Sequence, residues 1–85
     1  MKKVQGMYSV FDAKAESFAV PFYAENDNVA RRIFGDAAAG KDTMLHAHPE
    51  DFFLYKVGEF ECGQGLVVPC KVISLAKASD FVKEV

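Results

Sequence analysis

Residues 52–61 read FFLYKVGEFE, and this stretch decides the fold because it carries the strongest strand signal in the chain. Phe53, Tyr55 and Val57 recur at every second position, as side chains on one face of a β-strand do. The apolar parity shifts immediately after Val57, where Gly58 stands. The pattern therefore predicts a strand over 52–61 with a β-bulge at Gly58.

The segment that follows predicts a hairpin partner for this strand. Residues 62–65 read CGQG and supply two glycines for a turn, and residues 66–75 read LVVPCKVISL, a run rich in β-branched residues. Pro69 has no backbone N–H, so it marks a break or an edge position in the strand. The tail, residues 76–85, fits either a last half-strand or a short helix that places its apolar residues on the body.

The N-terminal part of the chain predicts a second hairpin. Residues 4–12, VQGMYSVFD, direct Tyr8 and Val10 to one face and other apolar residues to the opposite face. After a short polar connection, residues 18–23 again repeat apolar side chains at period two. Because Pro21 cannot donate to a strand ladder, we expect this second strand to lie at an edge or to bulge at Pro21.

A helix is predicted between the two hairpins. Residues 25–28 read ENDN and offer several N-capping side chains, and Gly40 provides a C-terminal stop. The apolar residues between them have the spacing of a buried helical stripe: Val29, Ala30, Ile33, Phe34, Ala37 and Ala38. Residues 48–51, HPED, predict one further helical turn, since proline suits the first helical position and carboxylates suit the N-terminal dipole.

The predicted elements define the fold class. The order β-β-α-β-β over residues 1–85 predicts a single α+β domain, with a mostly antiparallel four-stranded sheet and one amphipathic helix on one face. Such a helix covers only part of the sheet, yet apolar side chains point to both faces. The uncovered face must therefore meet a second subunit, the C-terminal segment or unstacked nucleic-acid bases.

Composition excludes several classes of protein. Hydrophobic residues make up 51% of the chain and the formal charge is −2, which is typical of a folded domain and not of a disordered one. The longest stretch without a charged residue, from Cys62 to Cys70, is nine residues, so no membrane span is expected. His46, His48 and the two cysteines match no zinc spacing, and no nucleophile elbow or phosphate loop is present. We expect no metal, no cofactor and no catalysis, in a reducing cytoplasm.

Single-stranded nucleic acid is a better candidate ligand, because exposed rings on a sheet accept the face of any base and nearby cations hold the backbone. The candidate residues are Lys2, Lys3, Tyr8, Tyr23, Arg31, Arg32, Tyr55, Lys71 and Lys77. The alternative is that the tyrosines are half-buried at a core edge or a dimer contact while the cations are simply solvated. Spacing alone does not choose between the two.

Five segments together resemble a known family: Tyr8–Ala15, Pro21–Phe22, Ala30–Asp36, His48–Phe52 and Leu54–Phe60. HPEDF followed by LYKVGEF is the most specific part. In this order the segments resemble the small non-structural protein of microviruses, the icosahedral single-stranded-DNA phages, particularly the gokushovirus branch.

The resemblance implies an accessory protein in the host cytoplasm that binds single-stranded or replicative-form DNA. Its role would be in the switch from genome replication to single-strand synthesis and packaging. The alternative is an adaptor that joins the replication initiator or the procapsid without touching DNA. Either way we expect a homodimer. His48 to Asp51 can be a scaffold, with Pro49 presetting the turn, or a site, and the sequence leaves both open.

Overall fold

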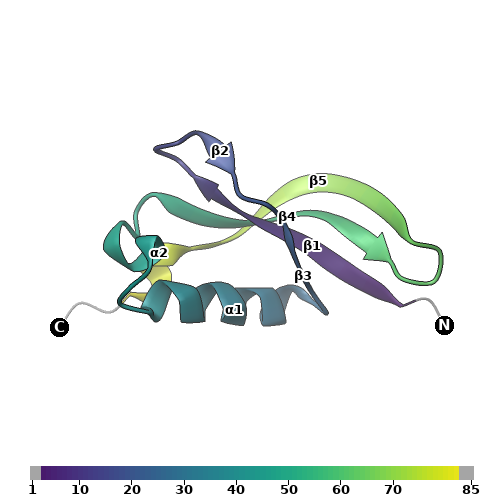
Figure 1. The fold of residues 1–85 in the computed structure, drawn as a ribbon, viewed down its shortest axis with the longest axis horizontal. Coiled ribbons are helices and arrows are strands. Elements are labelled where there is room, and N and C mark those ends of the chain that lie inside the picture. The colour runs from purple at the N-terminus through teal and green to yellow at the C-terminus, as the bar shows by residue number, and fades with distance from the viewer. Residues whose placement is uncertain (1–2, 83–85) are drawn as a thin grey trace.

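The computed structural model describes residues 3–82, which form a curled sheet with a helix along one face (Figure 1). The elements, in chain order, are strands β1 (Val4–Asp12), β2 (Ser17–Phe18) and β3 (Phe22–Ala24), helices α1 (Asp27–Ala39) and α2 (Met44–Ala47), strands β4 (Phe52–Glu61) and β5 (Leu66–Lys77), and the 3-10 helix η1 (Ala78–Phe81).

All strand pairs in the sheet are antiparallel. The strand order is β2-β1-β4-β5. β3 also pairs with β1, opposite residues 6–8, whereas β2 pairs opposite residues 11–12. The long strands β1 and β4 therefore lie in the middle, and β5 forms an edge. The predicted α+β class and the strand over 52–61 are confirmed.

The second predicted strand needs a correction. Instead of one strand over 18–23, two short pieces pair with β1 on either side of residues 19–21, so the sheet has five strands and not four. Pro21 explains the interruption, because it cannot donate to the ladder. Val20, expected to point alternately with its neighbours, is 90% exposed in the gap.

The predicted bulge in β4 is confirmed. Met7 pairs with Gly58 and Tyr8 with Lys56, so Val57 is the extra residue. A Cβ at Gly58 would lie 3.0 Å from the Val68 carbonyl oxygen, closer than side chains normally approach, which explains the glycine. β5 adapts by leaving residues 70–72 unpaired opposite the bulge.

Helix α1 begins and ends as predicted. The Asn26 side chain caps it by accepting a hydrogen bond from the Val29 N–H at 2.9 Å, and the Gly40 N–H donates to the last carbonyls. Its buried face consists of Ala30, Phe34, Gly35 and Ala38. Ile33 was expected on this stripe but is 44% exposed, because the buried face is centred on the line from residue 30 to residue 38.

The helical turn predicted at residues 48–51 is wrong. The short helix lies one turn earlier, at Met44–Ala47, where the Thr43 hydroxyl caps it by accepting from the His46 N–H at 3.1 Å. Residues 48–51 instead form a β-turn closed by a 3.0 Å hydrogen bond from the Asp51 N–H to the His48 carbonyl. Pro49 presets φ equally well for a helix start and for such a turn, so its presence did not discriminate.

The core lies between α1 and the sheet. Tyr8, Phe34 and Leu54 are its largest fully buried side chains. The tail contributes to it: β5 continues to Lys77, and η1 then places Phe81 edge-on against Phe34, with ring centroids 5.9 Å apart. Of the two alternatives for residues 76–85, the short helix is therefore the one adopted, as far as residue 82.

Gly35 allows this contact, and replacing it tests the packing. A Cβ at residue 35 would lie 2.6 Å from the Phe81 ring. In an open helix Gly→Ala stabilises by about 1 kcal/mol, but here we expect Gly35→Ala to lower the free energy of unfolding by about 1–3 kcal/mol through overpacking. Urea unfolding followed by circular dichroism measures it.

The Phe81→Ala background supplies the control. With the ring removed, Gly35→Ala should become neutral or stabilising, because only the helix propensity remains. The same loss of stability in both backgrounds would contradict the contact between Gly35 and Phe81.

Candidate nucleic-acid interface

The register of the sheet sorts its side chains onto two faces. Tyr8 and Leu54 pack against α1 in the core, and α1 lies on that side of the sheet only (Figure 1). Side chains alternate along a strand and directly paired residues share a face. We call the opposite side the outer face; its paired side chains include Gln5, Met7, Phe11, Phe18, Tyr23, Phe53, Tyr55, Phe60, Val67 and Lys77.

One group of rings on the outer face joins β1, β2 and β4. Phe11 and Phe18 have ring centroids 4.8 Å apart, and Tyr55 meets both edge-on at 6.3 and 5.5 Å. Phe18 is 48% exposed. The three rings therefore offer aromatic surface to solvent and support one another's orientation.

A second group lies at the other end of β1. Tyr23 of β3 and Phe60 of β4 meet edge-on with centroids 6.0 Å apart. Tyr23 is 47% exposed. Of the three candidate tyrosines, Tyr23 and Tyr55 thus lie on the same face, one in each group.

The charged residue at a paired position of the outer face, within the described strands, is a lysine. In the paired strands of the described residues, no carboxylate occupies an outer-face position, and Lys77 does. The Lys77 ammonium lies 5.7 Å from the Phe53 ring centroid and 3.1 Å from the Glu50 carboxylate, whose pKa it holds below its ordinary value by hydrogen bonding and by charge. Lys71 is exposed in the unpaired segment of β5, and Lys3 is exposed before β1.

Tyr8 requires a correction as a candidate stacking residue. Its side chain points to the helix side and is fully buried. The hydroxyl donates a 2.8 Å hydrogen bond to Oδ1 of Asp27, the first residue of α1. Burial, and then this carboxylate, raise the pKa of Tyr8 above its ordinary value. Tyr8 is a structural residue and offers no ring to a ligand.

The two arginines are also separated from the aromatic groups. Arg31 donates to the Asn28 side chain at 2.9 Å and to the Leu75 carbonyl at 3.4 Å, and Arg32 is exposed on the same helix. Both belong to α1 and therefore to the side of the sheet opposite the outer face. Lys2 lies outside the described residues.

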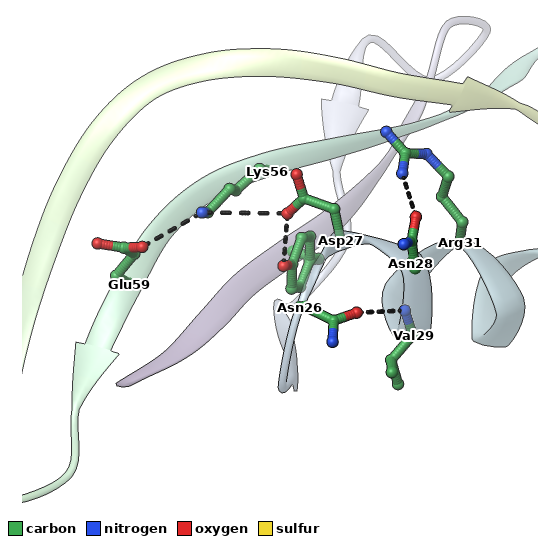
Figure 2. A network of polar contacts seen from close by, with 8 residues as sticks. Asn26, Asp27, Asn28, Val29, Arg31, Lys56 and Glu59 are labelled. Atoms are coloured by element: carbon green, nitrogen blue, oxygen red, sulfur yellow. Dashed lines mark hydrogen bonds and ion pairs between the residues drawn. The ribbon is translucent and has the colours of Figure 1, made fainter. Parts of the chain in front are cut away.

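A polar groove of about 540 Å³ lies where α1 begins. Two of its lining contacts come from Lys56, which reaches Glu59 at 3.2 Å and Asp27 at 4.0 Å (Figure 2). Glu25 and Arg31 line it as well, so its carboxylates outnumber its cations. This balance disfavours phosphate, and the groove's polar groups mainly hold the helix start against the sheet.

The histidines and cysteines lie apart in the fold. The His46 ring nitrogen Nδ1 is 3.0 Å from the Ala38 carbonyl oxygen, and both cysteines are free thiols. Within residues 3–82, no three metal-ligating side chains come together. No helix in this part of the chain is long and apolar enough to cross a membrane.

Sequence reasoning missed the outer-face roles of Phe18 and Phe60. Phe18 follows from the pairing of β2 with β1, which places it opposite Phe11. Phe60 follows from the bulge, which shifts the parity of β4 so that residues 53, 55, 58 and 60 share one face. The bulge was readable from the sequence, so Phe60 could have been found by carrying the parity shift through.

The bond between Tyr8 and Asp27 can be tested by its removal. We expect Tyr8→Phe to lower the free energy of unfolding by about 1–2 kcal/mol, measured by urea titration near neutral pH. Tyr23→Phe is the matched control, because it removes a half-exposed hydroxyl, and it should change stability little. Equal effects of the two substitutions would contradict a structural role for the Tyr8 hydroxyl.

The raised pKa of Tyr8 predicts that the stability of the protein depends on pH. The pKa of Tyr8 is higher in the folded than in the unfolded chain, so above about pH 10 unfolding releases a proton and stability falls as pH rises. Tyr8→Phe lacks this loss. The difference in free energy of unfolding between the wild type and Tyr8→Phe should therefore be constant and largest below about pH 10 and become smaller above it.

Comparison with known proteins identifies the family. The family described as "Phage ORF5 protein" matches residues 5–81. "Protein ORF5" of Chlamydia phage 1 is 30% identical over 80 residues, which cover 87% of this chain and 83% of that protein. No solved structure matches. These matches confirm the resemblance to a small microvirus-type phage protein, and the chain belongs to the Phage ORF5 protein family.

Proposed function

We propose that this phage non-structural protein binds single-stranded DNA through the outer face of its sheet. It has no catalytic role in this proposal and works in the host cytoplasm, where it acts in the switch from genome replication to single-strand synthesis and packaging. The observation that carries the proposal is the outer face itself: it holds two partly exposed groups of rings, and none of its paired residues in the described strands is a carboxylate.

The binding chemistry follows from these side chains. Bases stack on the exposed ring surface of either group, and each group contains one candidate tyrosine, Tyr55 or Tyr23. Lys3, Lys71 and Lys77 then pair with phosphates along the strand, which gives affinity that weakens with salt. Stacking tolerates any base, so this arrangement favours binding with little sequence preference.

The arginines take a secondary place in the proposal. Arg31 and Arg32 lie on α1, so a DNA strand would have to pass around the sheet edge to reach them from the outer face. The carboxylates of the polar groove lie on that same side. We therefore assign the main phosphate contacts to the lysines.

Fluorescence anisotropy of a labelled oligothymidylate tests the proposal. We expect saturable binding that falls steeply between about 50 and 200 mM salt. Tyr55→Ala should weaken it roughly 5- to 150-fold, since stacking is worth about 1–3 kcal/mol per base. Lys71→Ala should weaken it and reduce the salt slope by about 1.

Matched substitutions off the outer face serve as controls. Ile33→Ala truncates a half-exposed apolar residue of α1, and Lys41→Ala removes an exposed cation beyond it. Both should leave the affinity unchanged. If the protein binds at neither salt concentration, the proposal is refuted. Equal weakening by Ile33→Ala and Tyr55→Ala would refute the assignment to the outer face.

A second candidate function is an adaptor for the replication initiator or the procapsid, and the free edge of β5 favours it. This strand is 12 residues long, and among the described residues it pairs with β4 along one edge and with no strand along the other. Its exposed apolar side chains are Leu66, Val67, Val68, Val72 and Ile73. Unpaired backbone groups beside apolar side chains are suited to pairing with a strand of another chain.

The simplest such partner is a second copy of this chain, because antiparallel pairing of β5 with itself obeys twofold symmetry. We expect a dimer in sedimentation equilibrium, and Val72→Lys should shift it towards monomer by adding charge to the edge beside Lys71. Val20→Lys, in the exposed gap between β2 and β3, should leave the dimer intact. A monomeric wild type would contradict pairing through β5.

A further inference from the structure

A hollow of about 420 Å³ lies at the end of the outer face, beside the second group of rings. It is lined by Gln5, Tyr23, Phe60 and Cys62, from β1, β3, β4 and the turn after β4. Gln5 is directly opposite Phe60 in the β1–β4 ladder, and Tyr23 of β3 pairs with Met7, the next outer-face residue of β1. Three strands therefore hold its walls in place.

The walls combine aromatic surface with one amide. The Tyr23 and Phe60 rings meet at 69°, so they form two sides of a corner rather than a flat stack. Gln5 adds a side chain that both donates and accepts hydrogen bonds. A flat ligand with a π-face and polar edges satisfies both features, and the volume lies within the range of about 300–1,000 Å³ typical of small-molecule sites.

The charge around the hollow is suited to an anion-bearing ligand. The Cys62 N–H donates a 2.9 Å hydrogen bond to the Lys3 carbonyl, which places the exposed Lys3 next to the rim. None of the lining residues is acidic. The nearby Glu61 carboxylate is occupied by the N–H groups of Gly63 and Gln64, each at 2.8 Å, and Glu61 pairs on the helix side of the sheet.

We propose that this hollow holds one unstacked nucleobase of single-stranded DNA, with the adjoining phosphate against Lys3. The base lies against the Tyr23 and Phe60 rings, and Gln5 bonds its polar edge. This inference rests on the proposed function, and it assigns one base position within it. Base flatness, a polar edge and a neighbouring negative charge are the three properties that the hollow accommodates.

Cys62 gives a direct readout, because its exposed thiol lines the hollow while Cys70 lies on β5 outside it. The experiment measures the iodoacetamide alkylation rate of Cys62 in the Cys70→Ser protein, and of Cys70 in the Cys62→Ser protein. Each is measured with and without saturating oligothymidylate, and anisotropy is recorded on the same samples. At an oligonucleotide concentration about 100 times Kd, we expect Cys62 alkylation to slow by about tenfold or more. Cys70 lies beside the Lys71 phosphate contact but outside the hollow, so its alkylation should slow clearly less.

Substitutions then separate the hollow from the rest of the outer face. Gln5→Ala and Tyr23→Ala should weaken binding, and residual bound DNA should no longer protect Cys62. Tyr55→Ala should weaken binding through the other group of rings but leave Cys62 protected at saturation. Circular dichroism of each variant checks that the fold is retained, and Gln5→Ala keeps the test valid if Tyr23→Ala unfolds.

The outcomes distinguish this inference from the proposed function. Anisotropy binding with clearly stronger protection of Cys62 than of Cys70 supports both. Anisotropy binding without protection of Cys62 overturns the base pocket and leaves the DNA-binding function standing. No binding overturns both. Protection of Cys62 that grows with protein concentration in the absence of DNA shows that a second copy covers the hollow, which also overturns the base pocket.

Discussion

The hydrogen bond from the buried Tyr8 side chain to Asp27 is the constraint on which the rest of the structure depends. It joins the middle of a central strand to the first residue of α1, across 19 residues of sequence. Gly6 makes room for it, because a Cβ at that position would overlap the Tyr8 ring. Lys56 of β4 adds its charge beside the same carboxylate at 4.0 Å. With the helix held against this side of the sheet, the aromatic side chains of the opposite face remain uncovered by it.

The local features of the fold were predictable from the sequence. Short-range patterns predict these features. Alternation predicts strand β4 and a glycine predicts the bulge after Lys56, while a capping Asn26 and a terminal Gly40 predict the two ends of α1. The failures occurred where local signals were ambiguous. Pro49 fits a helix start and a β-turn alike, and only the capping by Thr43 places the short helix one turn earlier.

The candidate site was predictable in part, for a different physical reason. Alternation alone tells which residues share a face but not which face the helix covers. As an aromatic residue on a strand, Tyr8 is a candidate ring from the sequence. Its burial needs an acceptor for the hydroxyl, and that acceptor, Asp27, is distant in the sequence. Tyr23 and Tyr55 fell on the opposite parity and remained at the surface. Arg31 and Arg32 were correctly placed on the helix, but the sequence did not show that α1 lies on the other side from these rings.

The spacing of the two ring groups along β1 has a consequence for the length of single-stranded DNA that the proposed site would prefer. Gln5 and Phe11, which mark the two groups, are six residues apart, or about 20 Å of extended strand. Under the proposed function the groups act as two tethered weak sites on one rigid support, and a ligand must bridge them to gain from both. Affinity should then rise in a step once an oligonucleotide is long enough to span the gap. The distance between the two groups on the sheet thereby sets the minimum length of unpaired DNA that binds tightly.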